Sequence, residues 1–196
     1  MNIKTIILGP SNSGKSALLN VLRYDKFQNS SPTIGTQCER IVLKRVNFKL
    51  TLTMWEISSH LQNDERSKSF IPCYLKDSNL IIVVYNAQEK KSFLKAMKCF
   101  ESIQPFLTGF ENRIYFIGNC FGDISQGIRI RDSFIHKLKP NFKEIRNMLI
   151  NLKKKAEVER IITAIFSDFA LDSKFTQERT RRDRTCSVPY SNCIIF

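Results

Sequence analysis

The stretch GPSNSGKS, residues 9–16, decides the fold of this 196-residue chain. It matches the pattern G-x-x-x-x-G-K-[ST]. It stands between a short apolar run, residues 3–8, and residues 16–22, where apolar side chains recur at helical spacing. In a strand–loop–helix of this kind, backbone N–H groups and the positive end of the helix point at phosphate groups. An accidental turn of serine and glycine is the alternative, and the setting argues against it. The sequence therefore predicts a phosphate-binding loop.

The residues of this loop have separate expected roles. Lys15 would reach the terminal phosphates, and Ser16 would be a ligand of Mg²⁺. Asn12 tolerates a left-handed backbone better than most residues, so we expect a positive φ there. The loop residues expected to contact the bound phosphates are Ser11, Asn12, Ser13, Gly14, Lys15, Ser16 and Ala17.

Composition places the chain among ordinary globular proteins, with charge that favours an anionic partner. Hydrophobic residues make up 42% and charged residues 25%, as in one well-buried domain. Lys and Arg number 31 against 18 Asp and Glu, a formal charge of +13 that favours a phosphate ligand, an acidic membrane surface or nucleic acid. Nucleic-acid binding is not expected, because no recognition motif accompanies the charge. Six cysteines without a CxxC pair indicate free thiols in a reducing compartment.

Strand-like and helix-like segments alternate along most of the chain. Apolar runs predict strands over residues 3–8, 40–46, 48–55, 80–85 and 113–117, and helical spacing predicts helices over residues 16–22 and 91–106. The alternation predicts an α/β domain with a mostly parallel sheet flanked by helices.

The last third of the chain has a less regular pattern. Apolar residues at 142, 145, 149, 152 and 156 predict an amphipathic helix, with the lysines at 153–155 on its solvent side. A last strand over 160–166 and a last helix over 167–179 would follow. The apolar periodicity fades from residue 176, which predicts a domain over 1–175 and a disordered basic tail over 176–196.

Two segments after the loop choose among phosphate-binding proteins. Phe27 follows Lys15 by twelve residues, and the sequence Pro-Thr-Ile-Gly occupies residues 32–35. With the loop, these segments resemble the Ras superfamily of small GTPases, and within it the Rab branch. The resemblance covers residues 2–120 and implies a single P-loop small-GTPase domain that binds GTP or GDP with Mg²⁺. It also implies that Phe27 packs against guanine and that Thr33 binds Mg²⁺ and senses the γ-phosphate.

The second switch of that family is altered in WEISSHLQNDERSKSF, residues 55–70. Glu56 replaces the family's aspartate and would hold Mg²⁺ through a water molecule, its carboxylate displaced by one extra methylene. Ser59 replaces a glycine, and about four residues are added after it. His60 aligns with the water-positioning glutamine and is the catalytic candidate; Gln62 or Asp64 would take that place if the loop ran otherwise. We therefore expect slow or partner-dependent GTP hydrolysis.

The base-reading motif Asn-Lys-x-Asp is altered as well. Residues 119–123 read NCFGD, with cysteine in place of lysine and one added residue before the aspartate. Asn119 and Asp123 are the expected contacts to the base. A bulge at Gly122 would return Asp123 to that position, whereas an ordinary Gly-Asp turn would not. The family's Ser-Ala-Lys motif is at best matched by the sequence Thr-Ala-Ile at residues 163–165.

The chain ends in CIIF, residues 193–196, a Cys-aliphatic-aliphatic-X pattern. Its terminal phenylalanine predicts a geranylgeranyl group on Cys193. One lipid anchors weakly, so we expect a second signal, either the preceding basic segment or acylation of Cys186. The predicted location is the cytoplasmic face of an intracellular or plasma membrane. The arginines of the basic segment are Arg179, Arg181, Arg182 and Arg184.

Three functions are consistent with these patterns. The first is a divergent Rab-like GTP-binding switch of membrane trafficking, with effector proteins, an activating protein and an exchange factor as partners. The second is a membrane-tethered scaffold of GTPase fold in which nucleotide is held statically or not at all, favoured by the two altered motifs. The third is an ATP-using enzyme with the same phosphate loop. Whether the chain hydrolyses GTP is left open by its sequence.

Overall fold

A computed structural model describes residues 1–28, 33–45, 48–64, 69–107 and 112–185 of the protein. Its six-stranded sheet has the order β2-β3-β1-β4-β5-β6. Strand β2 pairs antiparallel with β3, and the other neighbours pair parallel. The strands are β1 (Asn2–Leu8), β2 (Thr36–Arg45), β3 (Phe48–Ile57), β4 (Leu80–Asn86), β5 (Arg113–Asn119) and β6 (Glu144–Ile150). The predicted α/β domain with a mostly parallel sheet is confirmed.

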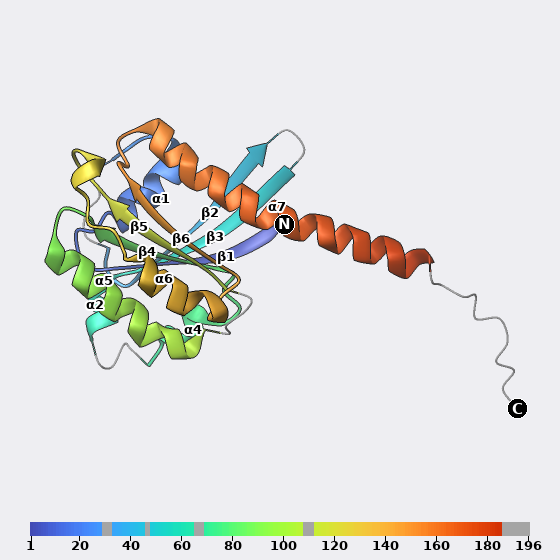
Figure 1. Ribbon diagram of the computed structural model, residues 1–196, viewed down its shortest axis with the longest axis horizontal. Helices are drawn as coiled ribbons and strands as arrows, with labels where there is room; N and C mark the ends of the chain where they lie inside the picture. The colour runs from blue at the N-terminus through green and yellow to red at the C-terminus, as the bar shows by residue number, and fades with distance from the viewer. Residues whose placement is uncertain (29–32, 46–47, 65–68, 108–111, 186–196) are drawn as a thin grey trace, which may run out of the picture.

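Helices cover both faces of this sheet (Figure 1). Helices α1 and α7 pack on one face, and α2, α4, α5 and α6 lie over the other. Their bounds are α1 (Lys15–Tyr24), α2 (Ser59–Asn63), α4 (Ile71–Leu75), α5 (Lys90–Ile103), α6 (Asp132–Leu138) and α7 (Lys155–Thr185). Short 3₁₀ helices are η1 (Gln104–Phe106), η2 (Ile124–Gln126) and η3 (Lys139–Asn141). No helix within the described ranges is both long and apolar enough to span a bilayer.

The central strand β4 is apolar because both of its faces are covered. Every residue from Leu80 to Tyr85 is fully buried, as predicted for a strand between two helical layers. Alternate residues of β4 enter the two halves of the core, since Ile82 and Val84 belong to one cluster and Ile81 and Val83 to the other. The buried sheet therefore fixes the positions from which the loops after its strands begin.

The predicted helix around residues 142–156 is wrong, because this segment forms β6 and the turn after it. Ile145 and Leu149 are both buried on the α5 side of the sheet. A spacing of four residues fits one helical turn, but it also fits two repeats of a strand, so the pattern did not discriminate. Pairing with β5, in which Arg113 lies opposite Glu144, settles the strand.

The predicted strand over residues 160–166 is also wrong, because these residues lie inside α7. The β-branched run of Ile161, Ile162 and Thr163 favours a strand locally. Burial has helical spacing instead, because Val158, Ile161, Ile165 and Phe169 all face the sheet. Helix α7 continues through Thr185, beyond the expected domain boundary at 175, and residues 186–196, including the predicted lipid site Cys193, lie outside the described residues.

Candidate functional site

The loop between β1 and α1 has the backbone that its sequence predicts. Asn12 has φ 57°, in the left-handed region. Gly9 has φ 141°, and a Cβ there would lie 2.1 Å from the carbonyl oxygen of Val84. Gly14, at φ 100°, is the N-cap of α1. These positive φ values curl the loop around the helix N-terminus, whose N–H groups favour an anion.

Lys15 is held inside this curl. Its ammonium donates to the carbonyl oxygens of Gly9, at 3.0 Å, and Pro10, at 2.9 Å. The side chain is buried, and this burial lowers the pKa of Lys15, while the charge of nearby Glu56 acts in the opposite direction. A cation placed on two carbonyls at the centre of the loop is suited to bind a phosphate, which would supply the counter-charge.

A cavity of about 570 Å³ opens over the loop, a size typical of small-molecule sites. It is lined by nine of the eleven predicted nucleotide contacts and by Glu56, the predicted metal residue of the second switch. Its lining is Ser11, Asn12, Ser13, Gly14, Lys15, Ser16, Ala17, Phe27, Gln28, Thr33, Glu56, Ser58, Ser59 and Phe121. Of the predicted nucleotide contacts, Asn119 and Asp123 are absent from this lining.

Three oxygen atoms meet at the start of α1. Glu56 Oε1 accepts hydrogen bonds from Ser16 Oγ at 2.7 Å and Thr33 Oγ1 at 3.0 Å. The two hydroxyl oxygens are themselves 3.0 Å apart. Glu56 is only 1% exposed, and its Oε2 is a buried atom without a hydrogen-bond partner among the described residues. A buried carboxylate oxygen without a partner is costly unless a cation or a hydrogen-bond donor satisfies it. The carboxylate and the two hydroxyls are oxygen ligands of the kind that Mg²⁺ prefers, so the residues present fit this ion.

This donor set suits a magnesium ion that is shared with phosphates. Mg²⁺ bound with a nucleotide commonly takes one or two carboxylates together with phosphate oxygens and water. In the described part of the chain, no group of three His, Cys, Asp or Glu residues is placed to hold a metal by itself. The hydroxyl–carboxylate set therefore requires a phosphate ligand to complete it.

The second switch is joined to the first switch and to the phosphate loop. Ser58 N–H donates to the carbonyl of Gly35 at 3.0 Å, and the Ser58 side chain caps α2 by accepting from Leu61 N–H. The hydroxyls of Ser11 and Ser59, which both line the cavity, are 2.8 Å apart. Residues of both switch segments, Thr33 from the first and Ser58 and Ser59 from the second, thus line the cavity together with Lys15.

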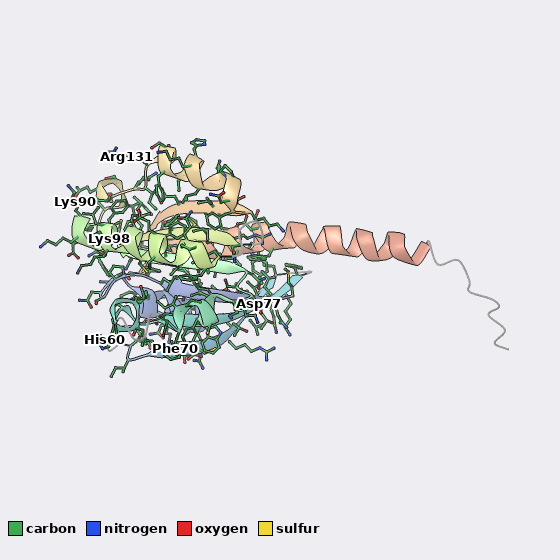
Figure 2. All side chains as sticks on the ribbon, turned by 90° about the horizontal axis from the view of Figure 1, so that it is seen from below. His60, Phe70, Asp77, Lys90, Lys98 and Arg131 are labelled. Atoms are coloured by element: carbon green, nitrogen blue, oxygen red, sulfur yellow. The ribbon has the colours of Figure 1, made fainter. Side chains whose placement is uncertain are left out.

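The structure does not bring His60 to the cavity. His60 is exposed on α2 and lies at the outer edge of the body (Figure 2). Gln62, one of the two alternatives from sequence, contacts the phosphate loop at Gly9. Its Oε1 accepts from Gly9 N–H and from Cys99 Sγ, and its Nε2 donates to the carbonyl of Ile57 at 2.7 Å. Neither side chain is placed to orient a water molecule over the cavity.

Asp123 adopts the turn geometry, which was one of the two alternatives from sequence. Its carboxylate accepts from Ser125 N–H at 2.9 Å and Ser125 Oγ at 2.7 Å, and it caps η2. These hydrogen bonds lower the pKa of Asp123. Asn119 is buried beside the loop, and its Nδ2 donates to the carbonyl of Ser13. Phe121 lines the cavity in place of the aspartate.

The segment after β6 contacts two residues of the cavity lining, Gly14 and Phe27, and was missed from sequence. Leu152 packs against Gly14, and the Lys153 ammonium lies 5.4 Å from the centre of the Phe27 ring. Ile150 pairs with Asn119, so the loops after β5 and β6 emerge side by side. Assigning residues 144–150 as a strand would have predicted that the loop after this strand lies beside the loop after β5. The expected Ser-Ala-Lys match is wrong, because Thr163 lies in α7, where its hydroxyl accepts from Arg45.

Comparison with models of known protein families gives one further finding. The model of the Ras family matches residues 4–171, from β1 into α7. The match therefore includes five strands in full, most of β1, and every residue of the cavity. The matched range contains the phosphate loop and both switch segments. The chain belongs to the Ras family, whose members are small GTP-binding switch proteins.

Proposed function

We propose that this small GTP-binding protein is a divergent, Rab-like switch of membrane trafficking whose GTP hydrolysis is slow or depends on a partner. The observation that supports switching is that Thr33 and Glu56 both form hydrogen bonds with Ser16, at the start of α1. Each comes from a different segment, and a shared Mg²⁺ ion and terminal phosphate would hold both. Loss of the γ-phosphate would remove one common partner of the two segments, which is how hydrolysis would change the surface offered to effectors.

Slow hydrolysis follows from the second switch. Water attack on the γ-phosphate in GTPases depends on a side chain that orients the water and on an arginine that stabilises the charge. His60 is exposed on α2, and Gln62 is engaged by Gly9, Ile57 and Cys99. A partner would have to supply a catalytic group or to rearrange α2.

A static scaffold is the second candidate. The bridge between the Ser11 and Ser59 hydroxyls favours it, because this bridge ties the second switch to the phosphate loop by the protein's own atoms. Membrane attachment is common to both candidates and rests on the sequence CIIF at residues 193–196 and the basic segment before it.

Nucleotide binding is the first test. GTP, GDP and ATP would be titrated with and without Mg²⁺ into the full chain, the Lys15→Ala variant and a Lys44→Ala control, whose lysine is exposed on β2. We expect Mg²⁺-dependent GTP binding that Lys15→Ala weakens by about a hundredfold, since the loop lysine faces the phosphates. A preference for ATP, or equal binding by the Lys15 variant, would refute the proposal.

Switching and anchoring need separate measurements. Single-turnover hydrolysis with an activating protein separates the switch from the scaffold, because the scaffold predicts none under any condition. Effector affinity should differ between the GTP and GDP forms if the protein switches. Sedimentation with acidic vesicles after prenylation should require Cys193, and Cys193→Ser protein should stay in the supernatant.

A further inference from the structure

The three oxygens beside α1 have the spacing of neighbouring ligands around one magnesium ion. Mg²⁺ demands near-octahedral geometry with bonds of about 2.0–2.1 Å, so adjacent ligand oxygens lie roughly 2.8–3.0 Å apart. The Ser16–Glu56, Thr33–Glu56 and Ser16–Thr33 oxygen distances are 2.7, 3.0 and 3.0 Å. These three atoms can therefore form one triangular face of a magnesium octahedron with little rearrangement.

The position of Glu56 allows its carboxylate to bind a magnesium ion directly. Its backbone lies in β3 between two paired strands, opposite Ile7 on one side and Gln37 on the other. It is 1% exposed, lines the cavity, and keeps Oε2 without a hydrogen-bond partner among the described residues. Burying a carboxylate with one oxygen unsatisfied is costly unless a cation compensates it. Pairing on both sides fixes the backbone at this residue, and the side chain reaches Ser16 from it.

Glu56 is one methylene longer than the aspartate that the family's second switch normally carries. The added methylene lengthens the side chain by about 1.5 Å, a large part of the step between a water-mediated and a direct contact with the ion. In Glu56 this length brings Oε1 within hydrogen-bond distance of both hydroxyls that are expected to bind Mg²⁺. A water molecule is not needed to connect the carboxylate to them.

We propose that Glu56 binds Mg²⁺ directly, together with Ser16 and Thr33, and does not act through a water molecule. This inference rests on the proposed nucleotide binding, which supplies the remaining phosphate ligands. Three protein oxygens and two phosphate oxygens leave a single position for water. The first switch, the second switch and α1 are then joined through one ion by direct bonds.

Counting the water molecules on the ion tests this assignment without measuring activity. Mn²⁺ replaces Mg²⁺ in the complex with a non-hydrolysable GTP analogue, and the broadening of its electron paramagnetic resonance lines by ¹⁷O-labelled water gives the number of bound waters. We expect one fewer water in the wild-type complex than in Glu56→Asp, whose shorter side chain needs a water bridge. Thr33→Ala is the reference variant, because loss of its hydroxyl should also add one water.

The affinity of the nucleotide complex for Mn²⁺ provides a second test of direct binding by Glu56. Glu56→Gln keeps the length and an oxygen but loses the charge, and it should weaken Mn²⁺ binding to the nucleotide complex by at least about tenfold. Equal water counts in wild type and Glu56→Asp would overturn direct binding while leaving nucleotide binding intact. Failure of the wild-type chain to form any Mn²⁺–nucleotide complex would overturn the proposed function together with this inference. Circular dichroism of each variant controls for folding.

Discussion

Replacing Asp168 by alanine should loosen the attachment of α7 to the sheet. The Asp168 side chain is 5% exposed, and its carboxylate accepts hydrogen bonds from the Tyr115 hydroxyl and from Arg146, whose Nε lies 2.8 Å away. Its backbone carbonyl accepts from Arg113 at 3.0 Å. The hydrogen bond to Asp168 raises the pKa of Arg146, and burial, followed by this same carboxylate, raises the pKa of Tyr115. One carboxylate thus connects α7 to both β5 and β6.

The magnitude follows from what the substitution leaves behind. Removing one partner of a buried ion pair costs about 3–5 kcal/mol, and an unsatisfied buried hydroxyl about 1–3 kcal/mol. The Arg146 side chain is 34% exposed, so water can replace part of its lost partner. We therefore expect Asp168→Ala to lower the free energy of unfolding by about 3 kcal/mol, or roughly 6–12 °C in Tm at this chain length. Tyr115→Phe, which removes only one hydrogen bond, should cost about 1 kcal/mol.

Urea unfolding followed by circular dichroism measures these differences, with nucleotide at a fixed concentration because a ligand shifts the equilibrium. The double variant Arg146→Met, Asp168→Ala removes the orphaned charge and should be more stable than Asp168→Ala alone. If the two substitutions were simply additive, or if Asp168→Ala cost less than Tyr115→Phe, the reasoning from a buried ion pair would be wrong.

Three shorter predictions concern the cavity and its surroundings. Asp123→Ala should change GTP affinity by less than about threefold, since the carboxylate caps a turn; a loss above about tenfold in a binding titration would assign it to the base. His60→Ala should leave single-turnover GTP hydrolysis within about twofold of wild type, and a larger fall would make it catalytic. Burial raises the pKa of the Cys99 thiol from 9.0 to about 11. The stabilisation that comes from burying the neutral thiol is therefore complete below pH 9 and is lost as the pH rises through 11 and the thiol ionises. Iodoacetamide labelling should therefore reach half of its maximal rate near pH 11 at Cys99, and at a lower pH at Cys99 in urea-unfolded protein; equal profiles would contradict the shift.

The phosphate loop was predictable because its determinants are local. Gly9, Asn12 and Gly14 each have a positive φ that the residue type allows, and Lys15 follows at a fixed spacing. Strands β1, β4 and β5 were equally predictable, since an apolar run between two helical layers has few alternatives. These elements position most of the cavity.

The rest depended on contacts distant in sequence. Ile145 and Leu149 fit a strand and a helix equally well, and only pairing with β5 decides between them. The wrong choice there concealed Lys153 beside Phe27. The direction of Gln62 could not be predicted either, because its hydrogen-bond partners come from the phosphate loop, β3 and α5. Such side chains are placed by tertiary packing and not by local preference.

The length of α7 has a mechanical consequence for a tethered protein. Its 31 residues correspond to about 46 Å of helix, and its buried residues described in the core end at Phe169. The remaining turns project away from the body (Figure 1). If Cys193 carries a lipid, these turns would add a rigid segment of roughly 24 Å to the connection between the sheet and the lipid-bearing end of the chain. The domain would then have fewer orientations available to it than one joined by an unstructured linker of the same number of residues.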